Sequence, residues 1–133
     1  MTVGTAPLRV DALDKVTGAA KYPADCVPPN ALHAVVVFTN QPHAKLLNLD
    51  VSEALSAPGV VTVVTAADVP VNEYGLTLFD QPVFIGLDDT GRSSVACNVS
   101  RWEADHLVVV IANSLLEARQ ASARIKRDRK SVV

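Results

Sequence analysis

The sequence contains little cysteine, few aromatic residues and no long hydrophobic run. Its two cysteines, Cys26 and Cys97, show no spacing typical of a disulfide framework or a thiolate metal site, so we expect a reducing, cytoplasmic setting. The longest apolar run, Leu107–Ala112, is far shorter than the roughly 20 residues that cross a bilayer. The amino terminus also lacks a basic segment followed by an apolar stretch. We therefore predict neither membrane insertion nor an export signal.

An excess of charge of one sign is lacking too. Lysine and arginine number 12 against 14 aspartates and glutamates, so the net charge is −2 and offers no field that would steer the chain to nucleic acid. Hydrophobic residues make up 49% of the 133 residues. A chain of this size can bury roughly 65–70% of its unfolded surface, so we expect one domain with a core of its own.

Segments rich in β-branched residues predict the strands. Leu32–Phe38 and Val60–Thr65 are bounded by proline, asparagine or glycine, and we predict both to be largely buried. Leu107–Ala112 is the most apolar segment and is predicted to form the centre of the sheet. Gln81–Ile85 predicts a further short strand, whereas Asn72–Thr77 has an irregular composition.

Capping signals predict the helices. Ser114 and Glu117 have the spacing of a capping box, and helical spacing of apolar residues follows them, which predicts the main helix. Ser52 is expected to cap a shorter helix. A single helical turn is predicted between Asp11, as its cap, and Gly18, which can take the left-handed conformation that ends a helix.

Together these elements predict an α+β domain in which a mixed sheet packs against two main helices. We assign residues 1–126 to this single domain. Residues 127–133 are predicted to be a charged, frayed tail, because Arg127–Lys130 carries charge where a packed strand would be apolar.

The loop Gly86–Ser93 has the glycine spacing of a phosphate-binding loop and follows a predicted strand. Its phosphate-contacting residues would be Gly86, Gly91, Arg92 and Ser93. Three features oppose this interpretation: arginine stands in the lysine position, Asp88 and Asp89 would place negative charge in the cradle, and the segment that follows is a poor helix former. A nucleotide-binding or other small-ligand-binding protein that uses this loop is kept as the alternative function.

Three residues are candidates for an interface or for ligand contact. His43 lies in a loop at a strand end, where binding residues are common. Arg101 and Trp102 precede the central strand, where they could contact a ligand by cation–π stacking, or where the indole could simply cover the end of the core. No spacing of histidines, cysteines or carboxylates predicts a catalytic residue, a cofactor-binding residue or a metal site.

Nine short motifs, taken in order, resemble one family. They are Val3-Gly4, Arg9–Gly18, Tyr22, Asp25, Leu32–Ala34, Pro42–Ala44, Pro58–Val60, Ala67–Pro70 and Arg101–Asp105. The chain thereby resembles the a/b hammerhead domain that opens the molybdopterin-binding large subunit of xanthine dehydrogenases and aldehyde oxidases. The resemblance covers roughly residues 3–126 and implies a mixed sheet with flanking helices.

The resemblance implies an enzyme that hydroxylates aldehydes or N-heterocycles with molybdopterin, iron–sulfur clusters and FAD. The pterin-binding groups and the catalytic base belong to later domains of that family, so no catalytic residue is carried over to this chain. By resemblance its partners would be the molybdenum domains and an iron–sulfur subunit. An exposed docking face could also be buried in a homodimer.

Two departures from the family pattern affect what we expect. Ala104–His106 stands where the family has glycine, an acidic residue and proline, so we expect an altered turn into the central strand. The charged residues after Ile125 replace an aromatic, acidic and proline-containing run. The function predicted is therefore a structural and assembly domain, detached from the catalytic domains and without activity of its own.

Overall fold

The structure is a computed structural model that describes residues 3–77, 81–87 and 96–131. The chain divides into two compact units, Met1–Ala31 and Leu32–Val133. Each is described by itself.

The first unit contains the helix α1, Ala12–Thr17, and the short 3-10 helix η1, Pro23–Asp25. Gly18 ends α1 with φ of 76°, and its N–H donates to the Lys15 carbonyl over 3.4 Å, as predicted. Asp11 precedes the helix but makes no side-chain cap. Its carboxylate pairs with Lys15 at 2.7 Å and with Arg9, and these two bonds lower the pKa of Asp11. None of the described residues of this unit is buried.

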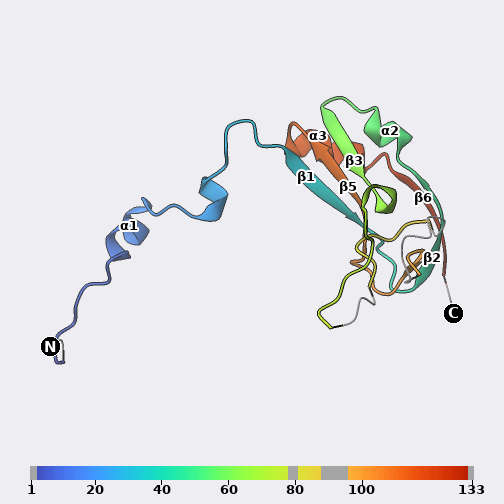
Figure 1. The fold of residues 1–133 in the computed structure, drawn as a ribbon. Coiled ribbons are helices and arrows are strands. Elements are labelled where there is room, and N and C mark those ends of the chain that lie inside the picture. Colours follow the sequence, from blue (N-terminus) through green and yellow to red (C-terminus); the bar gives the residue numbers. More distant parts are fainter. Residues whose placement is uncertain (1–2, 78–80, 88–95, 132–133) are drawn as a thin grey trace. The chain divides into compact units, whose positions relative to one another are not determined.

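The second unit holds a three-stranded sheet in the order β1-β5-β3 (Figure 1). Its strands are β1, His33–Phe38; β3, Val60–Val64; and β5, His106–Ala112. Both pairs are antiparallel, so the prediction that the most apolar segment occupies the centre is confirmed. Val108 and Val110 of β5 are completely buried.

A second antiparallel sheet has the order β4-β2-β6. Its strands are β2, Ala44–Asp50; β4, Val99–Ser100; and β6, Lys126–Ser131. Sequence reasoning missed β2, because the buried Ala44 and Leu46 begin an alternation that ends at a bulge between Leu46 and Asn48.

The predicted frayed tail is wrong for the residues described, since Lys126–Ser131 pairs along β2. Two alternate residues of β6, Arg127 and Arg129, are half-buried, and its other residues are exposed. Arg127 donates to the Phe38 carbonyl over 3.1 Å, and Arg129 donates to the Thr39 carbonyl. Burial and the neighbouring Arg129 lower the pKa of Arg127. The charged side chains therefore join the second sheet to the end of β1.

Two helices pack on the β1-β5-β3 sheet. The helix α3, Leu115–Ser122, contacts β1 and β5, and the short α2, Ser52–Leu55, contacts β3. Ser114 caps α3 as predicted, because its Oγ accepts from the Glu117 N–H over 3.2 Å. With eight residues, α3 is the longest helix of the described residues, and none of these helices could cross a bilayer.

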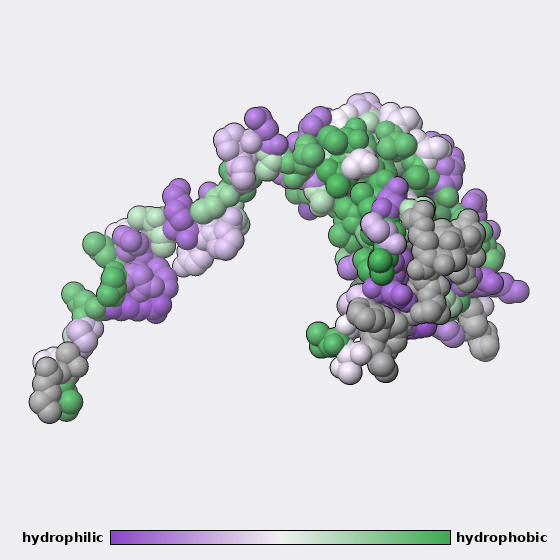
Figure 2. Space-filling model, viewed as in Figure 1, coloured by the Kyte–Doolittle hydropathy of each residue, from purple (hydrophilic) through white to green (hydrophobic). Residues whose placement is uncertain are grey.

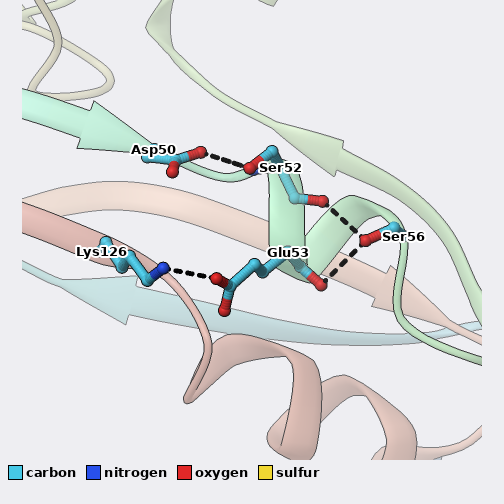
Figure 3. Close-up of polar contacts among 5 residues, drawn as sticks. All are labelled: Asp50, Ser52, Glu53, Ser56 and Lys126. Carbon is cyan, nitrogen blue, oxygen red and sulfur yellow. Dashed lines mark hydrogen bonds and ion pairs between the residues drawn. The ribbon is translucent and has the colours of Figure 1, made fainter.

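The cap predicted for α2 was wrong. Ser52 is the first residue of the helix and Val51 is its N-cap, while the Asp50 carboxylate just before them accepts from Ser52 N at 2.9 Å and from Ser52 Oγ at 2.6 Å. Lys126 of β6 pairs with Glu53, so the helix is also tied to the second sheet (Figure 3). Ser56 Oγ donates to the Ser52 carbonyl over 2.9 Å and closes the turn.

The Asp50 contacts predict how stability changes with pH. Hydrogen bonds from the Ser52 hydroxyl and N–H, and the charge of Lys126, lower the pKa of Asp50 below its ordinary 3.8. A lowered folded pKa gives stability that is present above 3.8 and is lost as pH falls through the folded value. We expect urea denaturation at pH values between about 5 and about 3 to show a smaller acid loss for Asp50→Asn than for the unchanged chain.

The matched control for this measurement is Asp14→Asn, which removes an exposed carboxylate of α1 outside the α2 contacts. Equal acid loss in Asp50→Asn and the unchanged chain would show that the Ser52 contacts add no pH-dependent stability.

The α+β class is confirmed, with the strands divided between two antiparallel sheets in place of one mixed sheet. The predicted strand at Gln81–Ile85 contributes only a single bridge, Tyr74 to Gln81. The main core lies between the β1-β5-β3 sheet and the two helices, where Ala54, Ala118 and Ala121 are completely buried. These small side chains allow the helices to approach the valines of the strands closely.

Candidate functional site

An exposed cleft of about 490 Å³ opens beside the start of β5. One wall is formed by Tyr74 and by residues 81–83, and the other by Arg101, Trp102 and residues 104–106. The cleft thus combines two of the three predicted contact residues, Arg101 and Trp102, with an aromatic residue that sequence reasoning did not single out.

A tight turn holds Arg101 and Trp102 in place. The Asp105 carboxylate accepts from the N–H of Arg101 at 2.6 Å and from that of Trp102 at 3.1 Å. The Asp105 N–H donates back to the Trp102 carbonyl over 3.3 Å. The carboxylate therefore closes the turn that leads into β5.

The end of β1 fixes this turn from the other side. Thr39 is only 3% exposed, and its hydroxyl donates within 3.2 Å to the carbonyls of Trp102 and Glu103. Its N–H donates to the Asp105 carbonyl over 2.9 Å, and Asn40 N donates to the Glu103 carbonyl over 2.8 Å. Buried hydrogen bonds of this kind hold a backbone in one conformation, so the backbone that carries the Trp102 side chain is rigid.

The opposite wall depends on a buried asparagine. Asn72 is 4% exposed, its Nδ2 donates to the Phe84 carbonyl over 2.8 Å, and its Oδ1 accepts from Phe84 N at 2.7 Å. Next to it, Tyr74 and Gln81 exchange backbone hydrogen bonds of 2.7 and 3.2 Å. These bonds hold two loop segments together and place the Tyr74 ring, which is 54% exposed, at the cleft.

His106, in the second wall, lies near two phenylalanine rings. Its ring lies 5.6 Å from that of Phe38 and 6.3 Å from that of Phe84, measured between centroids. The His106 carbonyl accepts from Ile85 N at 2.7 Å, which joins the wall formed by residues 81–83 to β5. The imidazole thus has aromatic neighbours, and among the described residues no group of three or more histidines, cysteines or carboxylates could hold a metal ion.

The other predicted residues lie elsewhere or outside the described part. His43 is exposed between β1 and β2 and does not line the cleft. Gly86 is buried, and its N–H donates to the Cys97 carbonyl over 2.9 Å. The rest of the loop with phosphate-binding spacing, namely Gly91, Arg92 and Ser93, lies outside the described residues.

Gly86 is close to the 3-10 helix η2, Ala66–Asp68. A Cβ atom at position 86 would stand 2.3 Å from the Cβ of Ala66, closer than any normal contact. Close packing of Gly86 on this helix accounts for the glycine, and the Gly86 N–H already donates to the Cys97 carbonyl, so it is not turned to a phosphate group. The described part of the loop therefore gives no support to the alternative of nucleotide binding.

We expect Gly86→Ala to lower the free energy of unfolding by about 2 kcal/mol, because the added methyl must displace Ala66 in a packed contact. Urea denaturation checks the value. The double variant Gly86→Ala/Ala66→Gly, which removes the opposing Cβ atom, separates the packing effect from the general cost of replacing glycine. An unchanged stability of Gly86→Ala would contradict the close approach to Ala66.

The fold and the cleft define a small α+β domain built on two antiparallel sheets. The family described as aldehyde oxidase and xanthine dehydrogenase, a/b hammerhead domain, matches residues 17–129 by its sequence model, and the chain belongs to this family. The resemblance inferred from the nine motifs is thereby confirmed.

Individual relatives agree with the family. The chain is 32% identical over 126 residues to xanthine dehydrogenase 1 of Arabidopsis thaliana, which covers 93% of this chain and 8% of the relative. It is 33% identical over 124 residues to the aldehyde oxidoreductase of Megalodesulfovibrio gigas, covering 90% of this chain and 14% of the relative. The solved quinoline 2-oxidoreductase of Pseudomonas putida 86 superposes with a TM-score of 0.81 and 26% identity, covering 100% of this chain and 17% of that chain.

Proposed function

We propose that this chain is the assembly domain of a molybdenum hydroxylase and has no catalytic residue of its own. One observation supports the proposal most directly: 93% of this chain matches a stretch that is only 8% of xanthine dehydrogenase 1. The activity would then reside in the remaining domains, with molybdopterin, iron–sulfur clusters and FAD bound there. The partners of this chain would be the molybdenum domains and an iron–sulfur subunit.

The first unit supports a role in assembly. Its apolar side chains Leu8, Val10, Leu13 and Val16 are between 70% and 102% exposed, and none of its described residues is buried. Apolar surface of this kind is costly in water, and such surfaces commonly mark contact sites for other proteins. Cys26 lies on the surface and Cys97 in the interior, and the two are not joined in a disulfide, which fits the proposed cytoplasmic location.

Activity and cofactor content test this function. The purified chain is expected to retain no molybdenum and to oxidise neither xanthine nor an aldehyde with an artificial electron acceptor. Mixed with the Megalodesulfovibrio gigas aldehyde oxidoreductase from which the matching domain has been deleted, it is expected to restore a stable complex. Turnover by the chain alone, or molybdenum bound to it, would contradict the proposed function.

A further inference from the structure

The β1-β5-β3 sheet has one face that the helices do not cover. Val35 and Val37 of β1 pack toward the core, so Ala34 and Val36 point to the other side. Cross-strand register places six residues on this side, which we name the outer face: Ala34, Val36, Thr62, Val64, Val109 and Ile111. No member of the outer face is charged, and Figure 2 shows hydrophobic residues gathered over β1, β3 and β5.

The outer face continues into the cleft. At its end, after a shift in register between Val37 and Phe38, Phe38 pairs with His106, and the centroids of their rings lie 5.6 Å apart. Phe38 is 38% exposed, and His106 lines the cleft. Beyond His106 lie the exposed rings of Tyr74 and Trp102. An apolar strip therefore runs from the middle of the sheet, across Phe38 and His106, to the only tryptophan of the chain.

We propose that the outer face and the cleft form one docking surface for the molybdenum-binding part of a hydroxylase large subunit, with Trp102 as its anchor. This inference rests on the proposed function, and it adds which surface of the chain contacts the rest of the enzyme. The contact on the partner is uncharged and aliphatic, because all six residues of the outer face are uncharged and mostly branched aliphatic. Tryptophan, tyrosine and arginine are the residue types that dominate binding energy at interfaces, and Trp102, Tyr74 and Arg101 line the cleft.

The size of the surface favours a neighbouring domain over a second copy of the chain. Three strands about 4.8 Å apart, with about five residues each at about 3.3 Å, present roughly 240 Å². The half-exposed rings of Tyr74 and Trp102 add on the order of 100 Å² each. Two copies would bury roughly 900 Å² in total, below the roughly 1,200 Å² of a stable dimer. Contacts between neighbouring domains begin near 600 Å² and resemble transient protein–protein interfaces, so an area of this size is sufficient for one.

Calorimetric titration tests the surface. The full chain is titrated into the Megalodesulfovibrio gigas aldehyde oxidoreductase that lacks the matching domain. Val36→Glu, in the outer face, and Trp102→Ala, in the cleft, are each expected to weaken binding about 30-fold. Leu116→Glu is the matched control, since Leu116 is a 66% exposed side chain on α3, which packs on the inner face. It is expected to change the Kd less than twofold.

A second readout reports on the cleft directly. Because Trp102 is the single tryptophan, labelling this chain with 5-fluorotryptophan gives one fluorine resonance that belongs to the cleft. On binding, that resonance is expected to shift and to lose its sensitivity to exchange of water for heavy water. This measurement needs no substitution, so it shows whether Trp102 lies at the docking surface even if Val36→Glu fails to fold.

The outcomes separate the two proposals. If the unchanged chain does not bind the aldehyde oxidoreductase that lacks the matching domain, the proposed function is wrong, and this inference is wrong with it. If the chain binds but Val36→Glu and Trp102→Ala bind equally well, or the fluorine resonance does not move, only the inferred surface is wrong. If the chain alone sediments as a dimer that Val36→Glu dissociates, the occupant is a second copy and the inference is overturned.

Discussion

Replacing Leu107 with alanine is expected to lower the free energy of unfolding by about 3 kcal/mol. Leu107 is completely buried in β5, the central strand, and belongs to the main core. The substitution removes apolar contacts and leaves a cavity, because the two neighbouring strands are paired on both sides of β5 and cannot close around it. A domain of this size is stable by only about 5–15 kcal/mol, so the loss is a large fraction of the total.

Urea denaturation of the Leu107→Ala variant checks this value. The matched control is Leu55→Ala in α2, where the side chain is 53% exposed and little contact is lost. We expect the control to lose well under about 1 kcal/mol. A loss below about 1 kcal/mol at Leu107 itself would mean that the strand is less firmly packed than the structure shows.

Replacing Asn72 with alanine is expected to cost a similar amount, about 3 kcal/mol. The side chain makes two hydrogen bonds with the backbone of Phe84, and both Asn72 and Phe84 are buried. Without the Asn72 side chain, the N–H and the carbonyl of Phe84 lose their hydrogen-bond partners in a buried environment. Each buried group left unpaired costs about 1–3 kcal/mol.

The Asn72→Asp variant sharpens this test. A carboxylate can still accept from Phe84 N, but it has no donor for the Phe84 carbonyl and places a negative oxygen beside it. We expect Asn72→Asp to be at least as unstable as Asn72→Ala at neutral pH and to recover partly in acid, where the carboxyl regains a donor. Asn48→Ala, at an exposed position of β2, is the control for both. Equal stability of all variants in chemical denaturation would exclude a structural role for Asn72.

The elements that sequence reasoning found are those with local signals. The strand β5 can be predicted from its apolar run alone, without knowing its partner strands. The cap of α3 can also be predicted, because Ser114 and Glu117, which form it, are only three positions apart in the sequence. By contrast, β6 consists almost entirely of charged residues, and its identity as a strand depends on pairing with the distant β2. Such pairing has no local signature, so the same residues were predicted to fray.

Sequence reasoning singled out only two of the residues that line the cleft, again because only they have a local signal. Arg101 and Trp102 draw attention by their residue types and by their position before the central strand. Tyr74 and Asn72 come from a segment with no periodic pattern, and only the folded chain brings them beside Phe84 and the turn at Trp102. The cap of α2 was wrongly assigned to Ser52 for a local reason: serine is a preferred capping residue, whereas the actual N-cap, Val51, belongs to a residue type that is rare there.

The bonds from β6 to β1 also determine the order in which the domain can assemble. The Arg127 guanidinium and the Phe38 carbonyl that it binds are 89 positions apart in the sequence. Contacts between such distant residues form late, because a long loop must close first. Because β5 pairs with β3 across 45 to 52 positions, whereas β2 pairs with β6 across 76 to 87, we expect the amides of β5 to become protected before those of β2 in pulsed hydrogen exchange during refolding. Simultaneous protection would contradict this order. During synthesis on the ribosome, β2 would therefore stay without its long partner strand until nearly the whole described chain has emerged.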